Sequence, residues 1–122
     1  MRPDSEKLLW DIFDAGRFIL TVTQGADETR YLGDRLFRQG IERNFEIIGE
    51  ALNALAKEDL PMAEQIGTYR QVINLRHRLV HGYRDIDDQR MWAYIQDLLP
   101  PFVLEVESLL EPDSTFKTDQ DD

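Results

Sequence analysis

The stretch NLRHRLVHGY, residues 74–83, places basic or titratable side chains inside an otherwise apolar segment: Arg76, His77, Arg78 and His81. Its Leu and Val residues recur at helical spacing, which predicts a helix from about Thr68 to His81 that stops at Gly82. A solvated helix face would not carry the leucines, and a core helix would not carry the charges. We therefore expect this helix to pack on one side and to present charge on another.

Two apolar stripes run along this predicted helix. The first suits the core of the subunit and contains Val72, Leu75 and Leu79. The second has the alternating spacing of a seam between packed helices and contains Tyr69, Ile73, Arg76, Val80 and Tyr83. A homodimer is the simplest source of a partner for the second stripe. The alternative is that this helix is buried within its own monomer.

The whole chain predicts an all-α bundle of four or five helices, with no convincing strand. Residues 1–110 form one domain, and residues 111–122 are acidic and predicted to be disordered. Besides the helix over 68–81, we expect helices over 5–22, over 29–56, and from Asp87 or Asp88 onward. The last is bent or interrupted by Pro100–Pro101 before it resumes through Leu109. Capping-box spacing of Thr68 and Gln71 predicts the start of the third helix. Gly33, Gly40 and Gly49 lie within the second predicted helix and mark close packing or a bend.

Charge is distributed unevenly in this acidic protein. The 122 residues carry a net charge of −10, but the window from Gln65 to Arg84 has no acidic residue and four arginines. The net charge therefore disfavours a protein that coats nucleic acid generally, and the positive window favours one small anionic ligand or a partner. The chain has no cysteine, no apolar run long enough to cross a membrane and no secretion signal, so we predict a cytoplasmic protein.

Arg76 and the two histidines are the candidate site residues. Arg76 either pairs with Glu46 or Glu50 of the preceding helix, or holds a phosphate with its planar guanidinium. His77 and His81 are four residues apart, a spacing at which both could meet a metal, although no third ligand is evident. Histidine exchanges protons near neutral pH, so His81 with an arginine could cleave RNA without metal. Arg76 and His81 are about 140° apart on an ideal helix, so they converge only if the helix loosens at Gly82 or a second subunit completes the site.

The sequence resembles the HEPN superfamily, specifically the HepT-like toxins that are paired with MNT nucleotidyltransferases. RHRLVHGY, residues 76–83, matches the family signature Arg-x4-His-x-Tyr at Arg76, His81 and Tyr83. ERNFEIIGEALNAL, residues 42–55, resembles the segment of the helix before it, and VHGYRDID followed by MW fits the next turn and helix. The resemblance covers about residues 5–110.

The resemblance implies a HEPN bundle that dimerises so that both motifs line one cleft. It also implies a metal-independent endoribonuclease toxin, without a cofactor, that acts on tRNA or mRNA. Arg76 would stabilise phosphate, His81 would be the acid and base, and Tyr83 would receive AMP from the MNT antitoxin, which silences the nuclease. His77 stands where the family often has Asn. With Arg78, Glu46 and Glu50 it would support the site.

Two other functions fit the same residues. One is a non-catalytic HEPN module that docks a nucleotidyltransferase and binds nucleotide in the Arg76 cleft. The other is a metal-sensing helical dimer that uses His77 and His81.

Overall fold

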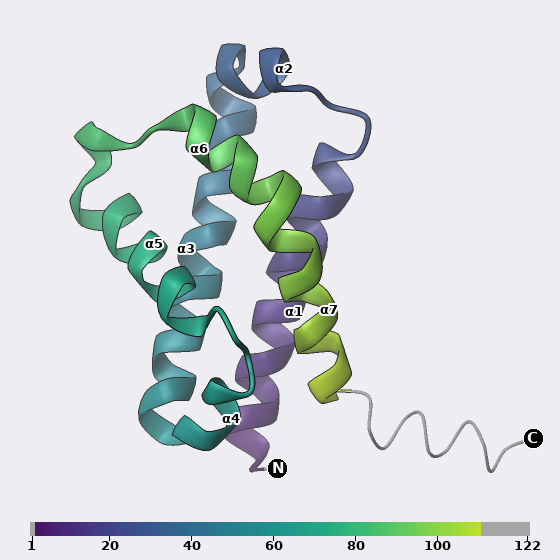
Figure 1. Cartoon of the computed structure of the whole chain (residues 1–122), viewed down its shortest axis with the longest axis vertical. Coiled ribbons are helices and arrows are strands. Elements are labelled where there is room, and N and C mark those ends of the chain that lie inside the picture. Colours follow the sequence, from purple (N-terminus) through teal and green to yellow (C-terminus); the bar gives the residue numbers. More distant parts are fainter. Residues whose placement is uncertain (1, 111–122) are drawn as a thin grey trace, which may run out of the picture.

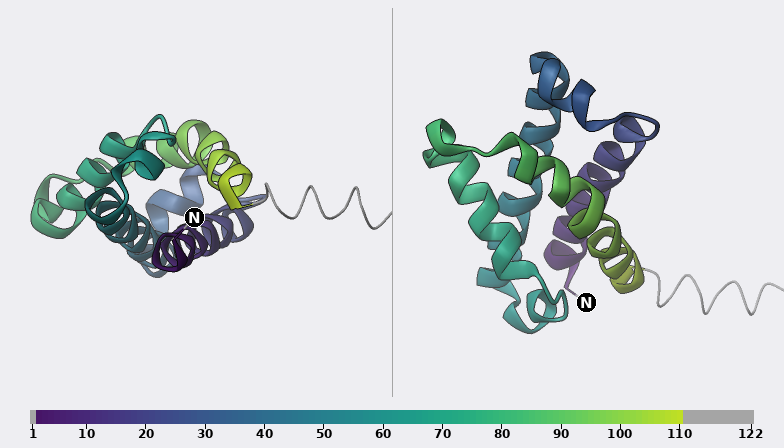
Figure 2. Two further views of the ribbon diagram at one scale, coloured as in Figure 1. Left: turned by 90° about the horizontal axis from the view of Figure 1, so that it is seen from below. Right: turned by 45° about the horizontal axis from the view of Figure 1, so that its top comes forward.

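The computed structural model describes residues 2–110, except for the side chain of Tyr83. Four helical legs run alternately up and down, and the end-on view shows them arranged around a common core (Figures 1 and 2). The elements are α1 (Pro3–Thr23), α2 (Glu28–Gly33), α3 (Arg35–Glu58), α4 (Leu60–Glu64), α5 (Tyr69–His81), a short 3₁₀ turn η1 (Tyr83–Asp85), α6 (Asp88–Ala93), a π turn η2 (Tyr94–Leu98) and α7 (Leu99–Leu110). No strand occurs within residues 2–110, and the predicted all-α bundle is confirmed. The predicted tail, residues 111–122, lies outside the described residues.

The legs are α1, α3, α5 and the combined α6–η2–α7 segment. α3 packs against both α1 and α5, and α1 packs against α7. The short helices α2 and α4 turn the chain at the two ends of the bundle (Figure 1). None of the described helices is both long enough and apolar enough to cross a membrane.

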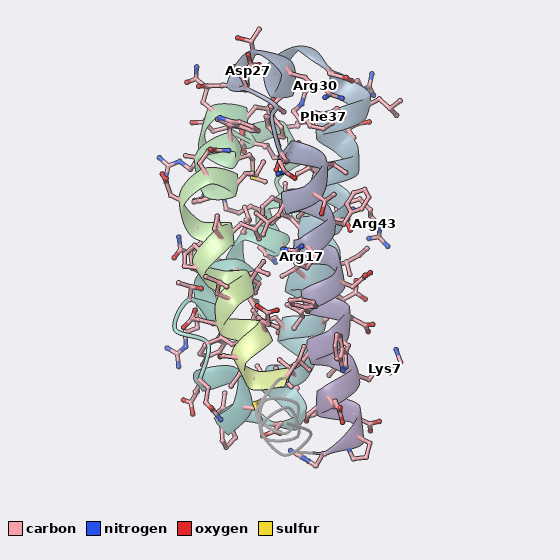
Figure 3. The ribbon with its side chains drawn as sticks, turned by 90° about the vertical axis from the view of Figure 1, so that its right-hand side faces the viewer. Lys7, Arg17, Asp27, Arg30, Phe37 and Arg43 are labelled. Atoms are coloured by element: carbon pink, nitrogen blue, oxygen red, sulfur yellow. The ribbon has the colours of Figure 1, made fainter. Side chains whose placement is uncertain are left out.

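The predicted second helix, residues 29–56, is wrong at its start, because the chain breaks between α2 and α3. Asp34 adopts an extended conformation there, and its carboxylate accepts a hydrogen bond from Phe37 N at 3.0 Å, which begins α3. Asp27 caps α2 by accepting from Arg30 N at 2.9 Å, and the Arg30 guanidinium lies 4.1 Å from the centre of the Phe37 ring (Figure 3). Each side-chain cap satisfies a backbone donor that would otherwise lack a partner. Two capped helices are therefore more stable here than one continuous helix.

The other helix ends follow the predictions only in part. Asp87 caps α6 as predicted, accepting from Gln89 N at 3.1 Å and Arg90 N at 3.2 Å. The predicted capping box at Thr68 is wrong, since the Thr68 hydroxyl makes no cap hydrogen bond at the start of α5. The helix α4 was not predicted. Asp59 caps it, and a proline occupies its first turn, where no backbone N–H is needed.

Pro100 and Pro101 do not separate the last leg into two helices. The leg changes from α to π geometry over η2, directly before the prolines, and continues as α7. Proline has no N–H and its ring crowds the carbonyl of the preceding turn. A wider turn with bonds five residues apart relieves that crowding, which explains why the interruption precedes the prolines.

The first stripe of α5 is buried as predicted. Val72, Leu75 and Leu79 are all in the core. The second stripe lies at the edge of the bundle: Tyr69 and Ile73 are partly buried against the core, whereas Val80 is 37% exposed. Part of the second stripe therefore already has a partner within the chain, and its upper end is open to solvent.

α3 and α5 approach each other closely at Gly49. A Cβ on this glycine would lie 2.8 Å from Arg76 Cγ and 3.3 Å from the Val72 carbonyl oxygen. Gly49 thus confirms the expectation of close packing. At Gly40, in the same helix, a Cβ would have no neighbour within 4 Å, and Gly33 instead ends α2.

Gly49→Ala and Gly40→Ala should change stability in opposite directions. The added methyl at Gly49 would meet the inflexible base of the Arg76 side chain, so α3 and α5 must separate, at a cost of about 1–3 kcal/mol. At Gly40 the methyl enters open space in a helix interior, and stability should rise by about 1 kcal/mol. Chemical unfolding of the two variants measures both effects. Equal stabilities for the two variants would contradict the close approach.

Candidate functional site

α5 holds the motif residues at fixed angles because it is a regular helix through His81. Gly82 forms the cap, and its N–H donates to the Arg78 carbonyl at 2.8 Å. The last turn is therefore closed, and the helix does not loosen before His81. Arg76 and His81 leave the helix axis about 140° apart, so within one chain they point to different sides of α5.

Arg76 lies at the boundary between the core and the surface, above Gly49 of α3. Its side-chain stem packs against this glycine, its Nε is buried, and that atom has no hydrogen-bond partner in the described part of the chain. The expected ion pair with Glu46 or Glu50 does not form. Glu46 instead pairs with Arg43 at 3.3 Å, and Glu50 is exposed. Arg76 is thus held in place by packing, with its charge left available to an anion.

His77 and His81 form a second group on the exposed face of α5. Their ring centres are 4.7 Å apart and their planes are tilted by 50°, as expected for side chains one turn apart. Both histidines are exposed. Residues 2–110 contain no group of three or more His, Cys, Asp or Glu side chains that could hold a metal ion, so this part of the chain adds no third ligand to the pair.

Tyr83 begins the turn that leaves α5. Its backbone opens η1 directly after Gly82, and Asp85 N donates to the Gly82 carbonyl at 2.9 Å. Its side chain lies outside the described residues. The third motif position therefore sits in the chain reversal between α5 and α6, at the corner of the bundle seen at the upper left of Figure 1.

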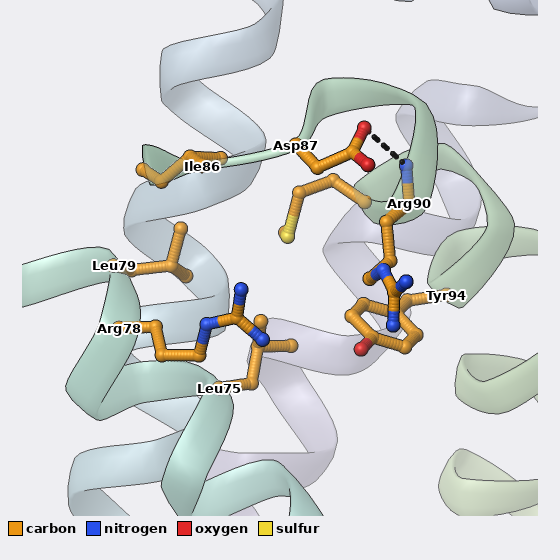
Figure 4. Close-up of a pocket in the computed structure, with 8 residues that line it drawn as sticks. Leu75, Arg78, Leu79, Ile86, Asp87, Arg90 and Tyr94 are labelled. Carbon is orange, nitrogen blue, oxygen red and sulfur yellow. Dashed lines mark hydrogen bonds between the residues drawn. The ribbon is translucent and has the colours of Figure 1, made fainter. Parts of the chain in front are cut away.

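A small pocket, with a cavity volume of about 20 Å³, lies between α5 and α6, next to the motif. Two arginines project into it, Arg78 from α5 and Arg90 from α6, and Tyr94 of η2 lies beside them (Figure 4). The remaining lining residues are Leu75, Leu79, Ile86, Asp87 and Met91. Arg78 was predicted as a supporting residue from the sequence, whereas Arg90 and Tyr94 were not predicted. They lie beyond the basic window, and only the fold, which places α6 and η2 across the pocket from α5, brings them near Arg78.

A second charged cluster joins α2, α3 and α6, outside the pocket. Arg38 lies 3.4 Å from the Asp88 carboxylate and donates to the backbone carbonyls of Tyr31 at 3.1 Å and Leu32 at 2.7 Å. Burial raises the pKa of Glu42, and the negative charge of Asp88 raises it further. Burial also raises the pKa of Tyr31 well above its usual value, and the negative charges of Glu42 and Asp88 raise it further.

Glu42→Gln should stabilise the fold at neutral pH. Between the unfolded and the raised folded pKa of Glu42, the folded state binds more protons, so stability falls as pH rises through that window. The amide removes both the desolvated charge and its repulsion by Asp88 and Glu46, while the favourable attraction to Arg38 is smaller. Thermal unfolding at several pH values measures this, with the exposed Glu50→Gln as the matched control. We expect the gain to vanish near pH 4; a variant that is less stable than the parent at pH 7 would contradict this.

Comparisons with known proteins agree with one another. The model of the family described as "Ribonuclease HepT-like" matches residues 12–109. Relatives include the protein named "Putative RNase MJ1380" of Methanocaldococcus jannaschii, which is 27% identical and covers 85% of this chain and 94% of its own length. The protein named "Probable ribonuclease HepT" of Thermococcus cleftensis is 25% identical and covers 82% of this chain and 90% of its own. No solved structure matches the chain significantly.

Proposed function

The chain belongs to the HepT-like ribonuclease family, within the HEPN superfamily, and on that premise we propose that it is a metal-independent endoribonuclease with Arg76 and His81 as its catalytic residues. The observation that carries this proposal is the unpaired Arg76. Its guanidinium has no carboxylate partner among residues 2–110, although its stem is fixed against Gly49. An arginine without a partner at a partly buried position is costly unless an anion completes it.

His81 supplies the proton transfer in this reaction. Its imidazole takes the proton from a ribose 2′-hydroxyl, and the 2′-oxygen attacks the adjacent phosphorus. The bond from phosphorus to the 5′-oxygen breaks, that oxygen takes up a proton, and the products are a 2′,3′-cyclic phosphate and a 5′-hydroxyl. Arg76 stabilises the extra negative charge of the phosphorane with its planar donors.

A second copy of the chain would bring the two groups into one cleft. Within one chain Arg76 and His81 diverge, because α5 remains helical to His81. The exposed Val80 and the partly buried Ile73 of the second stripe offer an apolar surface beside Arg76. A symmetric dimer along this stripe would align two copies of α5 and complete the site from both.

Two further residues support the site in this proposal. His77 contacts the His81 ring at a centre-to-centre distance of 4.7 Å and orients it, in place of the Asn found in much of the family. Glu46 and Glu50 of α3 are not part of the proposed site, because Glu46 pairs with Arg43 and Glu50 is exposed. Arg78 adds positive charge one turn before His81. This local charge suits RNA despite the net charge of −10.

Arg76→Ala and His81→Ala should each abolish most RNA cleavage. Loss of the acid–base group should slow turnover by roughly 10²- to 10⁴-fold, and loss of the oxyanion donor by roughly 10²- to 10³-fold. Cleavage of a labelled single-stranded RNA in excess chelator measures both. Arg17→Ala on α1 is the matched control, since this exposed arginine removes the same charge from another helix (Figure 3).

Full activity in both variants would contradict the proposal. A parent protein that binds nucleotide through Arg76 but cleaves no RNA would instead indicate a module that docks a nucleotidyltransferase. The same variants should relieve growth arrest when the chain is expressed alone, which tests its role as a toxin.

We further propose that Tyr83 is the control point of the nuclease. Its position, two residues after His81 at the exit from α5, would place an attached AMP at the mouth of the cleft. The added negative charge and bulk would repel and exclude RNA. The partner that transfers AMP would be an MNT-domain nucleotidyltransferase, which acts as the antitoxin.

Tyr83→Phe should retain RNA cleavage and lose its sensitivity to the partner. Coexpression with a cognate nucleotidyltransferase should increase the mass of the parent chain by AMP and silence its cleavage, whereas the variant should change in neither respect. Intact-mass spectrometry and the cleavage assay read the two effects separately. Modification of the Tyr83→Phe chain to the same extent would rule out this tyrosine as the acceptor.

A further inference from the structure

The pocket between α5 and α6 has a feature that the proposed catalytic pair does not explain. The guanidinium groups of Arg78 and Arg90 come from different helices and enter the same small space (Figure 4). Neither arginine has an ion-pair partner within residues 2–110. Two like charges that share a pocket repel each other, so the arrangement favours an anion between them.

The one carboxylate in the pocket is already engaged. Asp87 Oδ1 accepts hydrogen bonds from Gln89 N and Arg90 N at the start of α6. Its oxygen faces the helix backbone, as the dashed line in Figure 4 shows. Asp87 positions α6, and with it Arg90, while the pocket keeps a net positive charge in an otherwise acidic chain.

The pocket adjoins His81 through Arg78. These two residues are three apart on α5, which makes their side chains neighbours about 5–6 Å apart at Cβ. Arg76, in contrast, lies on the flank of α5 that packs on α3. An RNA strand that reaches His81 can therefore continue across Arg78 to Arg90, on the side away from Arg76.

Tyr94, at the edge of the pocket, suits a nucleobase. Tyr94 is partly exposed, and its ring lies beside the two guanidinium groups in Figure 4. Leu75, Leu79 and Met91 form an apolar floor. Single-stranded RNA is bound by this combination, with phosphates on arginines and bases stacked on aromatic rings.

We propose that Arg78, Arg90 and Tyr94 form a second RNA subsite, which holds a nucleotide next to the one that is cut. The two guanidinium groups bind its phosphate, and Tyr94 stacks on its base. The subsite deepens the proposed ribonuclease function and rests on it. Its residues bind and position the substrate and take no part in proton transfer.

The subsite is tested directly by measuring RNA binding to the His81→Ala protein, which should not cleave the RNA. Fluorescence anisotropy with a short single-stranded RNA should show that Arg78→Gln and Arg90→Gln each weaken binding about tenfold. Each should lower the slope of log K against log salt by about 0.7, the value for one lost phosphate contact. Tyr94→Ala should weaken binding at least about fivefold, and Tyr94→Phe should restore it, because stacking needs the ring only. Arg17→Gln should change neither affinity nor slope.

Cleavage kinetics distinguish a failure of the subsite from a failure of the proposed nuclease. They are measured with the same substitutions in the protein that retains His81. We expect KM to rise about tenfold and kcat to stay within about twofold, because the contact is equal in the ground and transition states. If the parent cleaves RNA while Arg78→Gln and Arg90→Gln leave KM and the salt slope unchanged, the subsite is wrong and the nuclease stands. If the parent cleaves no RNA, the nuclease is wrong, whatever the binding data show.

Competition identifies the ligand. Inorganic phosphate and AMP should compete with the RNA at least about tenfold more weakly than an unlabelled oligonucleotide, since each occupies only part of the subsite. Equal competition by AMP would overturn the assignment to RNA and indicate a nucleotide pocket. Folding of every variant is checked by its melting temperature, and these exposed or partly exposed positions should leave it unchanged.

Discussion

The contact between Gly49 and Arg76 determines how closely α3 and α5 approach, and the position of everything on α5 depends on it. Only a residue without a Cβ allows the stem of an arginine to cross α3 at this distance. The same contact turns Val72, Leu75 and Leu79 into the core and leaves the histidines on the open face. One constraint between two backbones thus determines both the packing of the helix and the direction of its charges.

Much of the bundle follows from short-range patterns in the sequence. The apolar periodicity of α1 and α5, and the stop at Gly82, predicted these helices to within a few residues. The break at Asp34 was missed because the apolar pattern continues through it, and the break depends on a local competition between a side-chain cap and one more helical turn. Thr68 failed as a cap for the opposite reason. Its spacing to Gln71 fits, but the backbone at this position does not bring the hydroxyl to a free N–H.

The motif could be located from the sequence, but its surroundings could not. Spacing along one helix predicts the angle between Arg76 and His81. It does not predict which charges find partners, because that depends on where long side chains end after the helices pack. Glu46 was a predicted partner for Arg76, yet it pairs with Arg43 within its own helix. Arg90 and Tyr94 come near Arg78 only because the fold places α6 and η2 across a pocket from α5, an arrangement for which a single sequence contains no signal.

The π turn of η2 has a consequence for comparing this chain with its relatives. A π turn accommodates one residue more than the α-helical turn that it replaces, so the two halves of the leg differ in rotational phase. Tyr94, at its start, lines the pocket beside α5, whereas Leu99 and Phe102 beyond it are buried in the core. A relative whose last leg is α-helical throughout would therefore align only with a one-residue gap inside this turn. An alignment without that gap would pair pocket positions with core positions, and it would hide whether Tyr94 has a counterpart.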